Sequence, residues 1–99
     1  MIRLSRKAQA QVASLVRHFE ALERPEATRN LRAALVRASE RIIRGHGLFF
    51  DAPRPYPGLT RPGWRWTKEG PYWIAFSSRG TTPVIQVVFY GAANIPERL

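Results

Sequence analysis

The chain has 99 residues, which is enough for one domain built on a single core, and we expect one domain spanning residues 1–99. Its 44% hydrophobic and 11% aromatic content argues against disorder, and the lack of cysteine excludes disulfides and thiolate-ligated metals. Sixteen basic residues face seven acidic ones, and the resulting formal charge of +9 predicts a polyanionic or acidic partner.

The N-terminus predicts a short strand followed by a helix cap. Ile2 and Leu4 alternate with their neighbours, which is typical of a strand, and Ser5 has a side chain preferred at a helix N-cap. The charged N-terminus leads into no apolar run, and no window of the chain approaches the roughly 18 apolar residues of a membrane span. We therefore expect a cytoplasmic protein with no membrane contact.

Two amphipathic helices are predicted next, separated by a short link. From Arg6 to about Glu23, apolar residues recur every three or four positions, which is the spacing of one helix face. Pro25 suits the first turn of a second helix with the same spacing, and Gly45 suits its C-terminal end. Because the link is only a few residues long, we expect the helices to form an antiparallel hairpin.

Arginines occupy the outer face of the second predicted helix. They are Arg29, Arg32, Arg37, Arg41 and Arg44. One interpretation of this face is a solvated surface, and the competing one is a docking surface for a negatively charged segment of a partner. Arginine suits such a contact because its planar guanidinium binds a carboxylate through two hydrogen bonds.

A loop is predicted over residues 46–63, where four prolines and three glycines interrupt regular structure. Little helix or strand can form there, because each proline lacks a backbone N–H donor. We expect Leu48, Phe49 and Phe50 to anchor this loop to the core, together with Tyr56.

After the loop, the apolar spacing changes from helical to alternating, which predicts three strands. The first begins at Trp64 and ends at a turn over residues 69–71. The second covers 72–77, and a further turn over 78–81 leads into the third, from Pro83 to Tyr90. Consecutive strands joined by tight turns form an antiparallel meander.

The predicted fold class is therefore α+β, in the order β-α-α-β-β-β. A short N-terminal strand precedes an antiparallel two-helix hairpin, and the three later strands form an antiparallel sheet. We expect the hairpin to pack on one face of this sheet, because each of the two needs an apolar partner surface.

Three stretches of the chain resemble the conserved stretches of one known protein superfamily. The opening IRLS leads into an alanine-rich helix start, KAQA. The stretch GPYWIAF at 70–76 is similar to the family strand G-x-Y-R-I-x-Y. The stretch VVFYGAANIP at 87–96 resembles the ParE-like ending V-x-H-G-A-R-D-I-P, and it is the most specific of the three. By these stretches, and by the order of its elements over the whole chain, the sequence resembles the ParE/RelE superfamily of toxins from type II toxin–antitoxin systems.

The resemblance implies one of two activities. ParE-type members poison DNA gyrase and are not nucleases, whereas RelE-type members cleave messenger RNA on the ribosome with basic residues on the sheet and a C-terminal tyrosine. Here Trp73 stands in place of the strand arginine, Ala93 and Asn94 replace an Arg-Asp pair, and no tyrosine follows Tyr90. These departures favour the ParE-like, non-enzymatic interpretation, and they leave open a degenerate toxin without activity.

The candidate target-binding surface is basic and aromatic, a combination that suits phosphate contact and base stacking. Its members are Arg54, Arg61, Arg65, Lys68, Trp73, Arg79, Tyr90 and Asn94. If the chain were a nuclease, its catalytic candidates would orient the 2′-hydroxyl and assist proton transfer. Those candidates are Arg65, Lys68, Arg79 and Tyr90.

The pattern of residues predicts no cofactor and no metal. His18 and His46 stand alone, without nearby carboxylates or cysteines, and no nucleophile is paired with a base. Several aromatic residues of the strands also have a plainer interpretation as core or edge side chains. These are Trp64, Trp66, Tyr72 and Trp73.

As partners we expect a cognate antitoxin, acidic and ParD-like or similar, and either DNA gyrase or the ribosome as the target. The residues expected to bind the antitoxin are Arg29, Arg32, Arg37 and Arg41. The leading functional hypothesis is a ParE-like growth inhibitor. The alternatives are a RelE-like ribosome-dependent mRNA endonuclease and a small nucleic-acid-binding module with no toxin role.

Overall fold

The computed structural model of the chain describes residues 1–53, 56–79, 82–91 and 94–96. The predicted α+β fold class and the order β-α-α-β-β-β are confirmed. The elements are β1 (Arg3–Leu4), α1 (Arg6–Ala21), α2 (Pro25–Arg44), a short 3-10 helix η1 (Pro57–Leu59), β2 (Trp64–Glu69), β3 (Tyr72–Arg79) and β4 (Thr82–Tyr90).

The cap residues act as predicted at both helices. The Ser5 hydroxyl accepts a hydrogen bond from the Ala8 N–H at 3.1 Å and so caps α1. Pro25 opens α2, and Gly45 ends it in the left-handed conformation, at a φ of 69°. Among the described residues, neither helix combines the length and the apolar character needed to cross a membrane.

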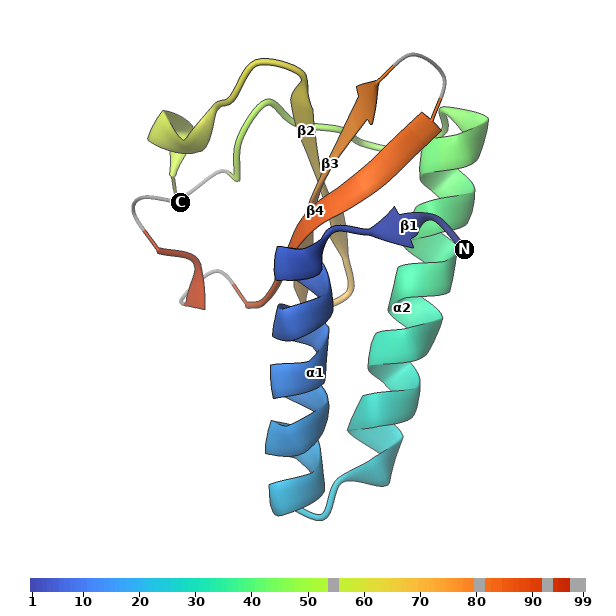
Figure 1. Ribbon diagram of the computed structural model, residues 1–99, viewed down its shortest axis with the longest axis vertical. Coiled ribbons are helices and arrows are strands. Elements are labelled where there is room, and N and C mark those ends of the chain that lie inside the picture. Colours follow the sequence, from blue (N-terminus) through green and yellow to red (C-terminus); the bar gives the residue numbers. More distant parts are fainter. Residues whose placement is uncertain (54–55, 80–81, 92–93, 97–99) are drawn as a thin grey trace.

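The two helices form the predicted antiparallel hairpin, and this hairpin runs past the end of the sheet (Figure 1). Near its tip, Phe19 and Leu31 are 1% and 0% exposed. Phe19 also packs edge-on against the ring of Tyr90, with the two ring centroids 5.4 Å apart. The projecting part of the hairpin therefore packs against the last residue of β4.

The four strands form one sheet in the order β1-β4-β3-β2, so β1 and β2 are its edges. β2, β3 and β4 make the predicted antiparallel meander, and β1 pairs in parallel with the middle of β4. The strands are longer than the sequence predicts, because Glu69, Ser78 and Arg79 pair in the ladder rather than lie in the turns.

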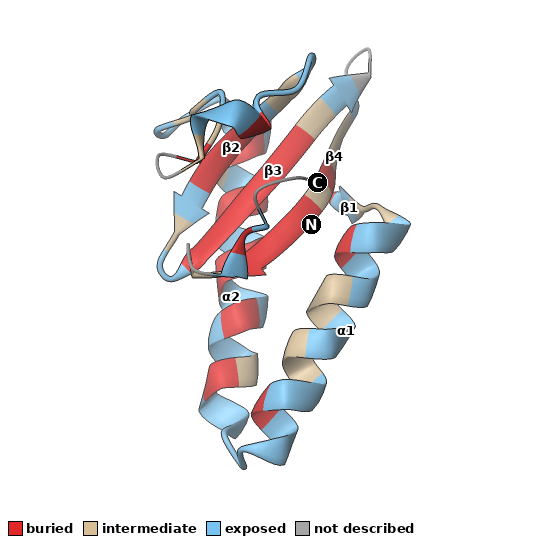
Figure 2. Cartoon of the chain, turned by 90° about the vertical axis from the view of Figure 1, so that its left-hand side faces the viewer, coloured by how far each residue is buried: buried red, intermediate tan, exposed pale blue. Residues whose placement is uncertain are grey.

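The helices cover one face of the sheet. The core between them is lined by apolar residues of β3 and β4, among them Ile74, Ile85 and Val88, which are at most 2% exposed. Figure 2 shows the buried residues following β3 and β4 and the inner sides of both helices. This is the packing that the two apolar helix faces predict.

The opposite face of the sheet carries a second apolar core, which the sequence did not predict. Trp66, Trp73 and Phe89 are 0%, 5% and 8% exposed on this face. Leu59 of the loop and Ile95 of the C-terminal segment close over them. The loop and the C-terminal segment therefore form a third layer, and neither face of the central strands is open to solvent.

Three of the four predicted loop anchors are confirmed. Phe49 packs on the helix-side core, whereas Phe50 and Tyr56 pack on the second core. The expectation for Leu48 is wrong, since its side chain is 74% exposed. Successive side chains of an extended segment point in opposite directions, so Leu48 and Phe49 do not face the same core.

Candidate functional site

The exposed face of α2 offers two arginines that are not engaged elsewhere. Arg29 and Arg32 are exposed, and neither side chain makes an ion pair or a hydrogen bond with another residue that the structure describes, although Arg29 interacts electrostatically with Glu26. Both were predicted to bind an antitoxin. Their charges are available to an acidic partner without breaking any contact within the fold.

The other two predicted antitoxin-binding arginines hold the domain together. Arg37 Nε donates to Glu69 Oε1 at 2.8 Å, and Arg41 Nη2 donates to Glu69 Oε2 at 2.6 Å. Arg41 Nη1 also donates to the hydroxyl of Thr67 at 3.0 Å, and that hydroxyl donates to the carbonyl oxygen of Leu48 at 3.2 Å. We call these five residues the Glu69 clasp. It joins α2, β2 and the start of the loop.

The clasp determines the charge state of its carboxylate. Partial burial acts to raise the pKa of Glu69, but the hydrogen bond from Arg37 and the positive charge of Arg41 outweigh it. The pKa of Glu69 therefore lies below its usual value, and the carboxylate is ionised at neutral pH. Arg41 is thus largely neutralised within the fold and is a weaker candidate for partner contact than Arg29 or Arg32.

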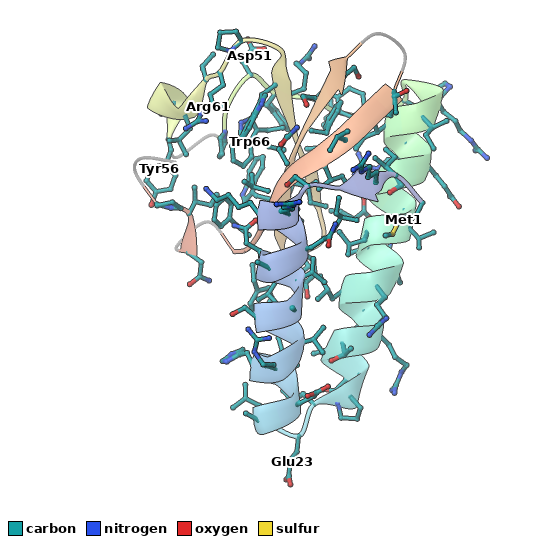
Figure 3. All side chains as sticks on the ribbon, in the orientation of Figure 1. Met1, Glu23, Asp51, Tyr56, Arg61 and Trp66 are labelled. Carbon is teal, nitrogen blue, oxygen red and sulfur yellow. The ribbon has the colours of Figure 1, made fainter. Side chains whose placement is uncertain are left out.

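The predicted target-binding cations of the loop and of β2 point in different directions. Arg61 lies over the ring of Trp64, with its guanidinium carbon 5.0 Å from the ring centroid. Arg65 reaches along the loop, donating to the Phe49 carbonyl at 3.3 Å and approaching Asp51 at 3.7 Å. Figure 3 shows Asp51 and Arg61 on the loop side of the molecule, away from the tip of the helix hairpin.

Lys68 and Arg65 lie on opposite faces of the sheet. The two residues are three positions apart on β2, so their side chains leave opposite faces of the sheet. Lys68 lies opposite Trp73 in the ladder and is exposed. Trp73 is 5% exposed and is a member of the second core, so it is not an open stacking platform.

Two further predicted cations have no described side chain. Arg54 lies outside the described residues. Arg79 pairs with Thr82 at the end of β3, and only its backbone is described.

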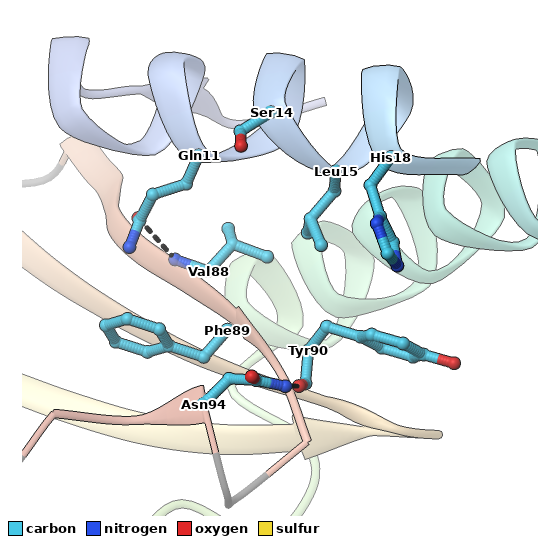
Figure 4. Close-up of a pocket in the computed structure, with 8 residues that line it drawn as sticks. All are labelled: Gln11, Ser14, Leu15, His18, Val88, Phe89, Tyr90 and Asn94. Atoms are coloured by element: carbon cyan, nitrogen blue, oxygen red, sulfur yellow. Dashed lines mark hydrogen bonds between the residues drawn. The ribbon is translucent and has the colours of Figure 1, made fainter. Parts of the chain in front are cut away.

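Tyr90 and Asn94 line a cavity of about 350 Å³ between α1 and the end of β4 (Figure 4). The opposite wall is one face of α1, which contributes Gln11, Ser14, Leu15 and His18. The amide of Asn94 donates to the carbonyl oxygen of Tyr90, and the carbonyl of the Gln11 side chain accepts from the N–H of Val88 at 2.9 Å. The cavity is therefore lined by polar groups that already close the edge of β4.

This cavity holds no assembled catalytic group. No side-chain hydrogen bond among the described residues joins His18 to Ser14 or to Tyr90, so neither hydroxyl is paired with a base. Burial raises the pKa of Tyr72, whose ring neighbours that of Tyr90, and its hydroxyl stays protonated at neutral pH. Within the described parts of the chain, no three residues among His, Cys, Asp and Glu gather where they could hold a metal ion.

Sequence reasoning missed the α1 wall of this cavity, although a signal was present. Gln11, Ser14, Leu15 and His18 have the spacing of one helix face, and three of them are polar. Polar residues on a face next to the apolar stripe indicate a helix side that lies beside the sheet but is not sealed against it. No comparable signal in the sequence predicts that Glu69 meets two arginines from α2.

The described residues of the predicted target-binding surface therefore lie in three separate places. Arg61 and Arg65 lie beside the loop, Lys68 and Trp73 lie on the other face of the sheet, and Tyr90 and Asn94 line the cavity between α1 and β4. Comparisons with known proteins add no assignment. No protein-family model matches the chain, and a search of the curated proteins finds no relative.

Proposed function

We propose that this chain is the toxin component of a type II toxin–antitoxin system, and that it inhibits growth in the ParE-like manner, by binding DNA gyrase. The observation that carries the proposal is the fold. A two-helix hairpin packed on a meander of three strands, preceded by a short strand, is the arrangement that the resemblance of the three sequence stretches implies. The formal charge of +9 is in keeping with a macromolecular target and an acidic neutralising partner.

The second core favours the ParE-like hypothesis over the RelE-like one. In the RelE-like interpretation, basic side chains on the sheet would meet the messenger RNA. Here the sheet face away from the helices carries buried Trp66, Trp73 and Phe89, and the loop and the C-terminal segment cover it. Arg65 and Lys68 lie on opposite faces, so they do not act together on one phosphate. A non-enzymatic mode of action is the simpler account of this surface.

The decisive experiment is induction of the protein in a bacterial host, with growth, plasmid topology and transcript integrity measured in parallel. We expect growth arrest with altered plasmid supercoiling and DNA damage, while messenger RNA remains intact. Rapid transcript cleavage during translation would replace this proposal with the RelE-like alternative. Normal growth, together with nucleic-acid binding by the purified protein, would favour the plain nucleic-acid-binding module.

The antitoxin is proposed to approach the exposed face of α2 through Arg29 and Arg32. Replacing both with glutamate is expected to slow association with the cognate antitoxin at least tenfold at low salt, because long-range attraction steers the encounter. The matched control replaces Arg6 and Arg17, which are exposed on α1, with glutamate, so the formal charge changes by the same amount. Stopped-flow association rates measure the effect. If both double variants slowed association equally, the effect would come from the net charge of the protein and not from the α2 face.

A further inference from the structure

Another cavity, of about 340 Å³, lies at the outer edge of β2 and brings Lys68 and Trp73 of the predicted target surface together with Arg41 of α2. Its lining comes from α2, the loop, β2 and β3: Arg41, Leu48, Phe50, Lys68 and Trp73. We call it the Leu48 pocket. Three apolar side chains form its floor and wall, two cations stand at its rim, and no acidic side chain lines it.

The pocket is built by fixed groups. Phe50 packs edge-on against Trp73, with ring centroids 5.8 Å apart. Phe50 also makes two backbone hydrogen bonds of 2.7 Å with Trp66, which hold the loop against β2. The carbonyl of Leu48 accepts from Thr67, and Arg41 is held by Glu69. The walls therefore need no rearrangement to receive an occupant, which lowers the entropy lost on binding.

Leu48 is the unusual member of this pocket. Its backbone is held in place, yet its side chain is 74% exposed beside two aromatic rings. Covering a leucine side chain removes apolar area from water and is worth about 1.5–3 kcal/mol when complete. A single exposed apolar residue is common on protein surfaces, but Leu48 differs because it lines a preformed cavity with a polar rim, which is the form of a binding site.

The rim determines the charge of the occupant. Lys68 is exposed and makes no ion pair or side-chain hydrogen bond with any other described residue. Arg41 is 27% exposed, but its charge is largely neutralised by Glu69, so Lys68 carries the free positive charge of the rim. A carboxylate beside the pocket would pair with Lys68, whereas a cationic occupant would meet repulsion from it.

The edge of β2 determines the form of the occupant. The N–H and carbonyl of Trp66 both bond to Phe50, so they point away from β3. Backbone groups two residues along a strand point the same way, so the N–H of Lys68 also faces outward. Among the described residues this N–H has no hydrogen-bond partner, whereas the Lys68 carbonyl, which faces the same way, accepts from Arg41 Nη2 at 3.4 Å. An extended peptide can accept this hydrogen bond while it places one side chain in the pocket.

We propose that the Leu48 pocket binds an extended acidic peptide segment of a partner protein, with one large apolar side chain inserted between Leu48, Phe50 and Trp73 and a neighbouring carboxylate paired with Lys68. The pocket includes Arg41 of α2 but not Arg29 or Arg32, and the proposal does not depend on the toxin function. It requires only a partner segment that combines negative charge with a bulky apolar residue.

The test uses the full chain labelled with ¹⁵N and three synthetic pentapeptides, EDFED, EDAED and KSFKS. We expect EDFED to shift the indole N–H resonance of Trp73, with a dissociation constant on the order of 1 mM, as one anchoring side chain allows. EDAED and KSFKS should each bind at least tenfold more weakly. Equal shifts from EDFED and EDAED, or no saturable shift with EDFED, would overturn the proposal.

Two variants and one matched control locate the site. Leu48→Glu and Lys68→Glu should each weaken EDFED binding at least tenfold, and both alter exposed side chains, so the fold is retained. The control, Ile43→Glu, changes a side chain that is 66% exposed on α2 and does not line the pocket, and it should leave binding within twofold. Loss in all three variants would contradict the assignment. Tighter binding of free phenylacetate than of EDFED would rule out a peptide as the occupant.

Discussion

Glu69 is the residue on which the contact between α2 and β2 depends. It accepts hydrogen bonds from two arginines that belong to the same helix, and its own side chain is 16% exposed. An isolated exposed ion pair contributes little to stability, but a partly buried carboxylate that accepts two charge-assisted hydrogen bonds contributes more.

Replacing Glu69 by glutamine should lower the free energy of unfolding at pH 7 by about 1–3 kcal/mol. The pKa of this carboxyl is lowered in the fold, so its stabilising effect is complete above the pKa of the unfolded chain, about 4.3. The effect is lost as the pH falls through the lower pKa of the folded state. Urea unfolding of both proteins between pH 7 and pH 3 should therefore give curves that converge in acid.

The control for this prediction is Glu20→Gln, an exposed residue of α1 whose side chain makes no ion pair among the described residues. It should leave the pH dependence of stability unchanged. A constant difference between the wild type and Glu69→Gln at every pH would refute the link between the clasp and the ionised carboxylate.

Gly47 permits the clasp to close. Its φ is +118°, and a Cβ at this position would lie 2.8 Å from Nη1 of Arg41, which is already bonded to Thr67. Gly47→Ala should cost about 1–3 kcal/mol of stability because it combines backbone strain with displacement of the guanidinium. Gly58→Ala is the control, since a Cβ there meets nothing within 4 Å. Thermal unfolding midpoints compare the two, and equal small losses would contradict the argument.

At the scale of elements, Ser5 connects the start of α1 with β4. Its hydroxyl accepts from Ala8 and donates to the carbonyl of Gln86 at 2.9 Å. Ser5→Ala should therefore cost about 1–2 kcal/mol, more than the loss of a cap alone, because a carbonyl at the sheet edge also loses its partner. The control is Ser14→Ala, at an exposed position inside α1. If chemical denaturation gave equal losses of stability for the two variants, the double role of Ser5 would be refuted.

The elements most readily predicted from the sequence are those with local signals. Both helices have a regular apolar spacing, and Ser5, Pro25 and Gly45 fix three of their four ends; the first helix was predicted to about Glu23 and ends at Ala21. The strands were predicted too short, for example by Glu69 at the end of β2 and by Thr82 at the start of β4. Both residues are polar, and they belong to the strands because of their pairing and not because of their propensity. The third layer could not be predicted, since a proline-rich segment gives no periodicity from which its packing follows.

The candidate site was less predictable than the fold. The odd separation of Arg65 and Lys68 does place them on opposite faces of a strand, and this could have been read from the sequence. The burial of Trp73 could not, because it depends on Phe50 and on a loop far from it in the chain. The engagement of Arg41 likewise depends on Glu69, 28 positions further on.

For the whole molecule, the excess of positive charge sets how stability responds to salt. Sixteen basic and seven acidic residues on a domain with a radius of gyration of 13.0 Å repel one another more than they attract. Raising sodium chloride from 10 to 150 mM shortens the screening length to about 8 Å, and we expect the urea midpoint to rise. The Arg29→Glu/Arg32→Glu variant, with less net charge, should show a smaller rise. A midpoint that falls with salt would mean that the ion pairs of the clasp dominate.

The pairing of β1 with β4 has a consequence for biosynthesis. β1 pairs with residues 84 and 85 of β4, and Ser5 donates a hydrogen bond to Gln86, 81 positions later in the chain. Contacts so distant along the chain form slowly and late. A ribosome making this chain must release residues 84–86 before the N-terminal segment can dock, so β1 and the start of α1 stay without their sheet contacts while all the residues between them are made.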